Sequence, residues 1–233
     1  MIKEDAVGWH TEIANQFEIK YKENRNFIER FTVWRNVISK YSGTEIRALD
    51  LGCGNGIYSA YMSPLNASVI GIDASEEMLK YCFSKKETLK LDNTVFIKAD
   101  IRDLKKILPN KVDLIICSSV LEYLQGLKES LLILSSLLSE KGTIIFSLPN
   151  KKSLYRKCEH MFYLLTGRPK YYKFVKCTSA IKEVDKELNA MGFKVIEHAY
   201  YGETPFLSRI FRKFGAAQYS DNLFLIVAKP SNQ

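Results

Sequence analysis

The chain has 233 residues, of which 46% are hydrophobic and 12% aromatic, with only 6 Pro and 12 Gly. This composition excludes a disordered, collagen-like or low-complexity chain and predicts a single globular domain over residues 1–233. The 34 Lys and Arg residues outnumber the 26 Asp and Glu residues and give a net charge of +8. A basic surface attracts the phosphates of nucleic acid, anionic lipid or a small substrate, and composition alone does not choose among them.

The sequence gives mostly negative signals for targeting and for metal binding. Residues 1–5 are charged and lack the apolar stretch of a secretory signal, and no apolar run approaches the roughly 18 residues that span a bilayer. The 5 cysteines are odd in number and lack the spacing of a disulfide framework or a zinc site. We expect a cytoplasmic protein without a metal, and peripheral attachment to a membrane stays open.

The predicted elements alternate along the chain after an N-terminal helical cap over residues 1–42. Residues 24–41 place apolar side chains at steps of three and four, which predicts an amphipathic helix. The predicted strands are residues 46–51, 68–73, 94–99, 112–117, 143–148, 193–200 and 222–229, and the further helices are residues 57–65, 75–90, 127–138 and 179–190. Apolar strands separated by helices predict an α/β fold, a Rossmann-like doubly wound sheet with helices on both faces.

A glycine-rich loop follows the first predicted strand. Gly52, Gly54 and Gly56 stand at alternate positions, where the missing Cβ atoms let a ligand approach the backbone. The dinucleotide fingerprint has a different spacing, Gly-x-Gly-x-x-Gly. Asp50 beside the loop would repel a pyrophosphate but suits a ligand with an ammonium group. Taken alone, the loop is equally compatible with a tight connection.

Acidic residues follow the next two predicted strands. Asp73 stands about 20 residues after the loop, where a carboxylate accepts hydrogen bonds from ribose hydroxyls. Asp100 follows the third strand and can accept from an adenine amino group while the amide of Ile101 meets a ring nitrogen. Each acid alone is also compatible with a solvated loop residue or a helix cap. Three acids at the ends of successive strands together favour one ligand site.

Four motifs in order carry a resemblance to a known family. They are residues 48–56, residues 71–75 with Met78-Leu79, residues 99–101 and residues 118–122. Over residues 47–150 the chain resembles the class I S-adenosylmethionine-dependent methyltransferases, which implies S-adenosylmethionine as cofactor and a seven-stranded sheet whose last strand is antiparallel. The resemblance also implies these sites: Gly52, Gly54 and Gly56 around the methionine part, Asp50 near its ammonium, Asp73 with Ala74 at the ribose, Met78 against the adenine, Asp100 and Ile101 on its edge, and Ser118 near the methionine end.

The residues after the fourth and fifth strands bear on the acceptor. Residues 120–123 and 146–150 are similar to the small-molecule branch of the family, including the O-methyltransferases of ubiquinone biosynthesis. In that branch the motif commonly continues Leu-Glu-His, whereas this chain has Tyr123. The motif typical of enzymes that methylate base amines is absent. We expect transfer to an oxygen of a small or amphiphilic acceptor, either lipid-linked or phosphate-bearing.

An oxygen acceptor usually requires a general base. The three histidines, His10, His160 and His198, are the candidates, although a lone histidine is more often a surface or core residue. We prefer His160 with Tyr123 as the catalytic pair, because the insertion after the fifth strand and the loop after the fourth strand both face the acceptor side. Much of the remaining catalysis is positioning of the reactants and exclusion of water.

The excess charge lies in a basic, aromatic insertion over residues 151–178. Its residues 151–176 contain eight Lys or Arg and one Glu, so they carry +7 and the rest of the chain +1. Basic residues around an aromatic stretch suit a lid at an anionic membrane surface, and residues 203–216 form a second patch of this kind. An RNA methyltransferase that uses the insertion is the alternative, although the missing base-amine motif makes nucleic acid a less favoured partner. A solvated helix pair and a non-catalytic S-adenosylmethionine-binding regulatory protein also stay open.

Overall fold

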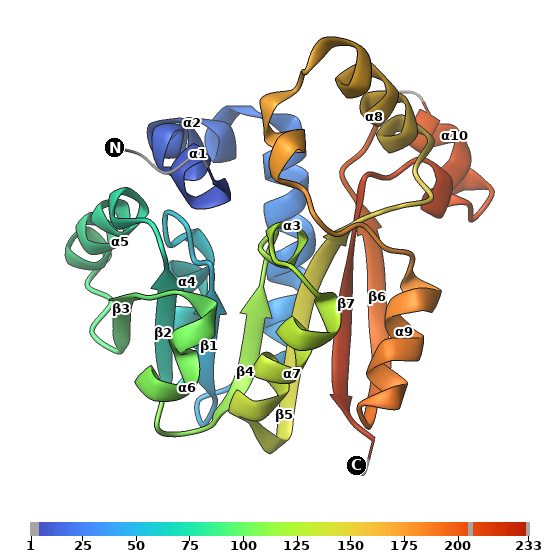
Figure 1. Ribbon diagram of the computed structural model, residues 1–233. Coiled ribbons are helices and arrows are strands. Elements are labelled where there is room, and N and C mark those ends of the chain that lie inside the picture. Colours follow the sequence, from blue (N-terminus) through green and yellow to red (C-terminus); the bar gives the residue numbers. More distant parts are fainter. Residues whose placement is uncertain (1–4, 205–206, 232–233) are drawn as a thin grey trace.

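The computed structural model describes residues 5–204 and 207–231, and these form a central sheet with helices on both faces (Figure 1). The strands are β1 (Arg47–Leu51), β2 (Ser68–Asp73), β3 (Thr94–Lys98), β4 (Val112–Cys117), β5 (Leu138–Pro149), β6 (Phe193–Tyr201) and β7 (Leu223–Pro230). Their order in the sheet is β3-β2-β1-β4-β5-β7-β6. Strands β1 to β5 pair in parallel, and β7 is antiparallel to both β5 and β6. The predicted seven-stranded, mostly parallel sheet with an antiparallel last strand is confirmed.

The described residues also form ten α-helices and five short 3-10 helices. The α-helices are α1 (Ala6–Glu12), α2 (Ala14–Glu23), α3 (Arg25–Tyr41), α4 (Ile57–Met62), α5 (Glu76–Leu89), α6 (Leu104–Ile107), α7 (Leu127–Leu137), α8 (Leu154–Thr166), α9 (Ile181–Ala190) and α10 (Leu207–Lys213). The 3-10 helices are η1 (Ser63–Leu65), η2 (Ile101–Asp103), η3 (Leu121–Tyr123), η4 (Lys170–Phe174) and η5 (Ala217–Tyr219). In these described ranges, no helix combines the length and the apolar character that a membrane crossing requires.

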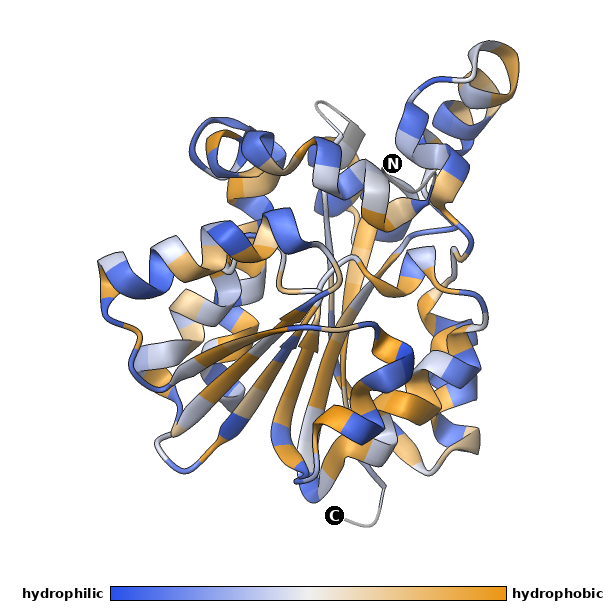
Figure 2. Cartoon of the chain, turned by 60° about the vertical axis from the view of Figure 1, so that its left-hand side comes forward, coloured by the Kyte–Doolittle hydropathy of each residue, from blue (hydrophilic) through white to orange (hydrophobic). Residues whose placement is uncertain are grey.

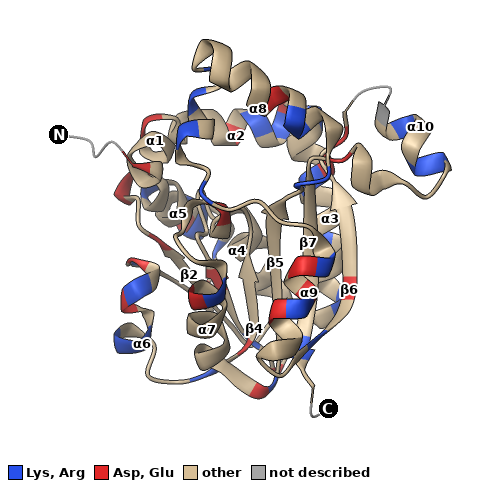
Figure 3. Ribbon diagram, turned by 45° about the vertical axis from the view of Figure 1, so that its right-hand side comes forward, with Lys and Arg blue, Asp and Glu red and all other residues tan. Residues whose placement is uncertain are grey.

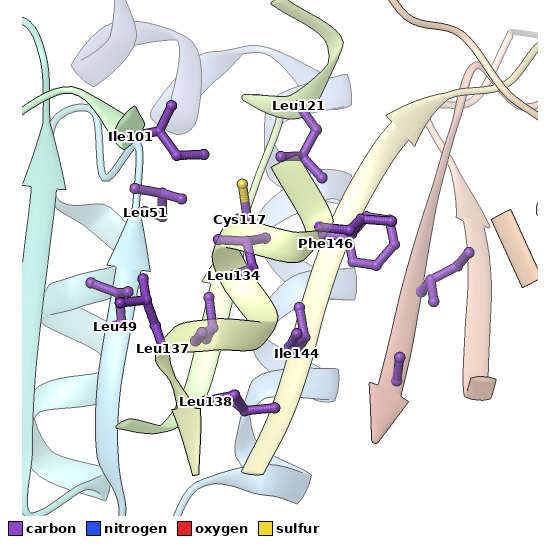
Figure 4. Packing of buried hydrophobic residues seen from close by; sticks show 14 of the residues in the cluster. Leu49, Leu51, Ile101, Cys117, Leu121, Leu134, Leu137, Leu138, Ile144 and Phe146 are labelled. Carbon is purple, nitrogen blue, oxygen red and sulfur yellow. The ribbon is translucent and has the colours of Figure 1, made fainter. Parts of the chain in front are cut away.

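The two faces of the sheet bury separate cores. Side chains alternate along a strand, so Leu114 and Ile116 of β4 join α3 and α4 on one face, while Ile115 joins α7 on the other. Figure 4 shows the second core, in which Leu134 of α7 packs near Phe146 of β5. Figure 2 shows hydrophobic residues concentrated along the strands. This packing holds the carboxyl ends of the strands in fixed positions.

Strand β5 begins five residues before its predicted start. The expected strand covered residues 143–148, whereas β5 begins at Leu138. The added residues include Glu140 and Lys141, which are polar and exposed. A prediction based on runs of apolar residues therefore did not include them in the strand. This first part of β5 pairs with β4, where Leu138 lies opposite Val112. The register between the two strands shifts before Leu114 pairs with Thr143.

Helices α1 and α2 cover the glycine-rich loop after β1. In α2, Glu18 accepts a hydrogen bond of 2.9 Å from the side chain of Asn55 and forms an ion pair with Lys85 of α5. In α1, the hydroxyl of Thr11 lies 2.8 Å from that of Ser75, the N-cap of α5. These polar contacts attach α2 to the loop and both helices to α5 or its N-cap.

Candidate functional site

A cavity of about 1240 Å³ lies at the carboxyl ends of the strands. The order of the sheet reverses between β1 and β4, and ligands of open α/β sheets bind in the crevice at such a reversal. Elements that contribute to the wall include the loops after β1, β2 and β4, the helices α1, α2, α3 and α8, and η4. Pockets for one small ligand measure roughly 300–1,000 Å³, so this cavity has room for two.

The glycine-rich loop forms one end of the cavity. Gly52, Gly54 and Gly56 all have positive φ angles, of 68°, 54° and 75°. A Cβ on Gly52 would lie 2.1 Å from Cγ2 of Val120, whereas a Cβ on Gly54 would meet no heavy atom within 4 Å. Gly54 therefore presents open backbone to the cavity. Gly56 is not part of the wall; it is the left-handed N-cap of α4 and packs near Cys82.

Asp73 joins this loop to the end of β2. Its carboxylate accepts hydrogen bonds of 2.8 Å from the amide of Gly54 and 2.8 Å from the amide of Ser75. Burial raises its pKa. Asp73, Ala74 and Met78 line the cavity, so the carboxylate that fixes the loop also lies at the wall.

Asp100 and Ile101 contribute the wall after β3. The carboxylate of Asp100 accepts 2.8 Å and 2.6 Å hydrogen bonds from the guanidinium of Arg102, which also lines the cavity. Ile101 begins η2 and is nearly buried. The Asp100 side chain thus reaches the cavity already paired with a cation.

Asp50 lies away from the cavity wall. The side chain in β1 is 1% exposed, and its carboxylate accepts a hydrogen bond of 2.6 Å from the hydroxyl of Ser59 in α4. Burial raises the pKa of Asp50 to about 7. Asp50 was expected near the ammonium group of the ligand; its carboxylate instead points into the layer between β1 and α4 and is not part of the cavity wall.

Arg30 of α3 is a cavity residue that the sequence analysis missed. Its Nη2 donates a hydrogen bond of 2.8 Å to the hydroxyl of Ser118, and its buried Nε has no hydrogen-bond partner. Both residues line the cavity. The signal was present in the sequence, since Arg30 falls between Phe27, Phe31 and Trp34 on the apolar stripe of the helix. A charge on a core-facing stripe indicates a polar site.

Aromatic side chains build the other end of the cavity. The ring of Trp9 in α1 lies 6.1 Å from that of Tyr171 and 6.5 Å from that of Phe174, both in η4. The ring of His10 lies 5.0 Å from that of Tyr123, with the planes at 73°. All five residues line the cavity. The N-terminal cap and the insertion after β5 therefore meet over one space.

Two buried ionic side chains lie in the wall of this aromatic end. Nη1 of Arg156 in α8 and Oε2 of Glu122 in η3 are both buried without a hydrogen-bond partner. The Nε of Arg156 donates to the carbonyl of Asn222 at 3.2 Å, and Glu159 lies 3.8 Å from its Nη1. Burial raises the pKa of Glu122. A buried polar atom without a hydrogen-bond partner is costly, so this wall suits contact with a polar ligand group.

The structure does not bring His160 to Tyr123. His160 is exposed on α8, outside the cavity wall, and its ring lies 5.3 Å from that of Tyr172. His198 is exposed on β6 and is also outside the wall. Tyr123 lines the cavity as expected, but its histidine neighbour is His10. His160 and Tyr123 do not lie together, because the side of α8 that carries His160 faces outward.

The described residues contain no group of three or more His, Cys, Asp or Glu side chains that could hold a metal ion. The cavity wall has another character: open glycine backbone and carboxylates at one end, and aromatic rings with buried ionic groups at the other. This arrangement suits an organic cofactor beside an organic substrate.

Comparison with known proteins identifies the class. The profile of the family described as "Methyltransferase domain" matches residues 42–197. The chain is 30% identical over 169 residues to the ubiquinone biosynthesis O-methyltransferase of Pelagibacter ubique, which covers 66% of this chain and 68% of the relative. It is 34% identical to the probable S-adenosylmethionine-dependent methyltransferase CRG1 of Saccharomyces cerevisiae, over 58% of this chain and 46% of the relative.

Solved structures agree in fold. The N-methyltransferase NodS from Bradyrhizobium japonicum aligns with a TM-score of 0.67 and 16% identity over 97% of this chain and 99% of NodS. A methyltransferase from Archaeoglobus fulgidus aligns with a TM-score of 0.65 and 21% identity over 92% and 98%. The chain belongs to the methyltransferase family. It is an enzyme that uses S-adenosylmethionine as its methyl donor.

The residues at the glycine-rich end fit this donor. The space beside Gly54 lets a ligand lie against the backbone, and the Asp73 carboxylate at the wall is a group of the kind that accepts hydrogen bonds from ribose hydroxyls. The unpartnered Nε of Arg30 is buried at the same wall, where it suits a carboxylate group. When bound, S-adenosylmethionine supplies a methyl group on a positively charged sulfur.

Proposed function

We propose that this enzyme transfers a methyl group to an oxygen of a small amphiphilic acceptor. The observation that carries the proposal is the second, aromatic end of the cavity, walled by Trp9, Tyr123, Tyr171 and Phe174. Aromatic walls favour a flat apolar body, and the buried ionic groups in the same wall favour a polar substituent on it. The names of several relatives, ubiquinone biosynthesis O-methyltransferases, support an acceptor of this kind.

We propose that the donor is held at the glycine-rich end in the manner the family resemblance implies. Gly52 and Gly54 lie along its methionine part, Asp73 with Ala74 at the ribose, and Met78, Asp100 and Ile101 around the adenine. Ser118 lies at the methionine end, and to the residues of the resemblance we add Arg30, which donates a hydrogen bond to Ser118. The protein's own contribution to rate is then to align the acceptor oxygen with the methyl group and to exclude water.

We propose further that α8 binds an anionic membrane surface. Its outer end exposes Met161 (62%), Leu164 (67%) and Leu165 (83%), and Figure 3 shows no charged residue there. Lys157 and Arg168 flank this end of the helix in the sequence. An apolar helix end with basic neighbours is suited to the boundary between lipid headgroups and acyl chains. A lipid-like acceptor would then enter the cavity beneath the insertion.

The second basic patch contributes less to this surface. Its Arg212 forms ion pairs with Glu29, Glu203 and Asp221, so its charge is already neutralised within the protein. Phe214 remains 82% exposed. Residues 205–206 of the expected patch lie outside the described residues.

The test is to follow tritiated methyl from S-adenosylmethionine into a fractionated cell extract. The expected result is label in the lipid fraction. The labelled product should resist reagents that cleave esters, as a methyl ether does. Label in RNA would establish the alternative of an RNA methyltransferase. Absence of label from every fraction would favour a non-catalytic binding protein. The Asp73→Asn variant serves as the control for donor-dependent background.

A further inference from the structure

His10 has one ring nitrogen whose state the backbone determines. Nδ1 lies 2.7 Å from the carbonyl oxygen of Ala6, one turn earlier in α1. A carbonyl oxygen only accepts hydrogen bonds, so Nδ1 carries a proton. In a neutral imidazole the lone pair is then on Nε2. The helix therefore presets His10 as a proton acceptor at Nε2.

The ring lies where an acceptor would bind. Of the three histidines, His10 is the one that lines the cavity. Its ring contacts Trp9 at 4.7 Å, Phe17 at 6.1 Å and Tyr123 at 5.0 Å between centroids. These three neighbouring rings limit the space in which the imidazole can turn.

The electrostatic surroundings keep the imidazole neutral. Burial lowers the pKa of His10, and the nearby cations Arg30 and Lys20 lower it further, against the hydrogen bond to Ala6. The titratable and charged groups that line the same cavity include Asp5 of the α1 N-cap, Lys20 of α2, Arg30 of α3, Glu122 and Tyr123 of η3, Tyr155, Arg156 and Glu159 of α8, Tyr171 and Lys173 of η4, and Lys176. Helix α5 meets α1 through the uncharged pair Thr11 and Ser75. A neutral base is thus available at neutral pH.

We infer that His10 is the general base of this enzyme, and that it takes the proton of the acceptor hydroxyl at Nε2. The inference rests on the proposed function, transfer to oxygen. The hydroxyl O–H bond breaks and its proton passes to Nε2 as the oxygen forms its bond to the methyl carbon. The carbon–sulfur bond breaks with its electron pair left on sulfur, and the imidazolium afterwards releases the proton to solvent.

The first experiment tests the state of the ring without any turnover. Protein labelled with nitrogen-15 in its histidines and saturated with S-adenosylhomocysteine is titrated by NMR, with His10→Asn assigning the His10 signals. We expect a proton on Nδ1, a free lone pair on Nε2 at neutral pH, and a midpoint below the ordinary 6.5. A proton on Nε2 in the neutral ring would overturn the inference.

The second experiment tests catalysis with catechol as the oxygen probe and aniline as a nitrogen probe. The asparagine of His10→Asn keeps a donor near the position of Nδ1 but has no base, so we expect turnover of catechol to fall by roughly 10²-fold or more. The rising limb of the pH profile should disappear, while affinity for S-adenosylhomocysteine by calorimetry stays unchanged. His160→Asn is the matched control and should retain wild-type turnover.

The outcomes separate the two proposals. If wild-type protein labels aniline and not catechol, the proposed transfer to oxygen fails, and the role of His10 falls with it. If wild-type protein labels catechol and His10→Asn keeps the wild-type rate and pH profile, only the assignment of His10 is wrong. Circular dichroism of the variant separates a loss of folding from a loss of chemistry.

Discussion

The two ends of the cavity are built from different kinds of structure. The donor end uses short loops directly after buried strands, and its key carboxylate, Asp73, is fixed by backbone amides. The acceptor end uses segments attached to that framework, α1, α8 and η4, in which rings of α1 and of α8 lie close to rings of η4. The rigid edge of the sheet therefore forms the donor end, and the use of S-adenosylmethionine is what the family has in common. The attached segments are the parts free to differ with the acceptor.

The largest expected effect on ligand affinity comes from a change at the donor end alone. In Gly52→Ala the new Cβ meets Val120 at 2.1 Å, and the residue has a φ of 68° that disfavours side chains. We expect affinity for S-adenosylhomocysteine, measured by calorimetry, to fall by about 10²-fold or more. Gly192→Ala is the control, since its φ is 77° but its Cβ would meet nothing within 4 Å. Equal losses in both variants would mean that backbone strain, and not the cavity, is responsible.

Asp50, buried behind the donor end, gives the protein a predicted dependence of folding stability on pH. Its pKa is raised by burial from 3.8 to about 7 in the folded state. Between these values the folded protein binds more protons than the unfolded chain, so this contribution is present below about pH 4 and is lost as pH rises through about 7. Asp50→Asn should therefore gain stability relative to wild type over this range, by up to about 4 kcal/mol.

Urea unfolding at the two ends of that pH range measures the effect. The exposed Asp92→Asn is the control and should follow the wild-type pH dependence. A stability difference between Asp50→Asn and wild type that does not change with pH would contradict an ionising carboxyl at this buried position.

A substitution of Arg30 tests whether this residue contacts the methyl donor or the acceptor. Arg30→Met removes the guanidinium beside Ser118 but keeps a long apolar side chain. A hydrogen bond to a charged group contributes about 1.5–3 kcal/mol, so affinity for S-adenosylhomocysteine should fall by roughly 10- to 100-fold. Arg35→Met, exposed on the same helix, should leave the affinity unchanged. Unchanged affinity in Arg30→Met, with slower methyl transfer, would assign Arg30 to the acceptor end instead.

The smallest expected effect is on membrane binding by α8, at the acceptor end of the protein. Replacing Leu164 and Leu165 by Glu on α8 should reduce sedimentation with phosphatidylglycerol vesicles by about 10-fold, because the apolar end of the helix becomes charged. Affinity for S-adenosylhomocysteine should not change. Leu132→Glu on α7, where Leu132 is 48% exposed, is the control for added surface charge. Wild-type protein that stays in the supernatant would disprove the membrane surface.

Most of the fold could be predicted from the sequence, because strands buried on both faces are apolar along their whole length. Residues 68–73 and 112–117 are cases in which the predicted and observed strands coincide. The start of β5 could not be predicted in the same way, since its polar residues pair for reasons of register and not of burial. Local patterns therefore predicted the elements better than their ends.

The same distinction between local pattern and long-range packing separates the site residues that could be predicted from those that could not. Gly54, Asp73 and Asp100 stand at or just beyond the carboxyl ends of strands, so the topology of the sheet brings them to one cavity as predicted. His10 and Tyr123 are more than a hundred residues apart in the chain, and nothing in their local sequence indicates that α1 folds back over η3. Likewise the orientation of α8, which turns Arg156 inward and His160 outward, depends on packing that a sequence motif does not encode.

The polar contacts of Glu18 have a kinetic consequence. Because Glu18 of α2 contacts Asn55 of the glycine-rich loop and Lys85 of α5, we expect the donor and its spent product to exchange only when these contacts open. The acceptor end is closed instead by the rings of η4. We expect exchange of the two ligands to be gated separately, with release of S-adenosylhomocysteine as the slow event of the cycle. Glu18→Gln, which weakens the first gate, should then raise the steady-state rate while leaving the rate of a single turnover unchanged.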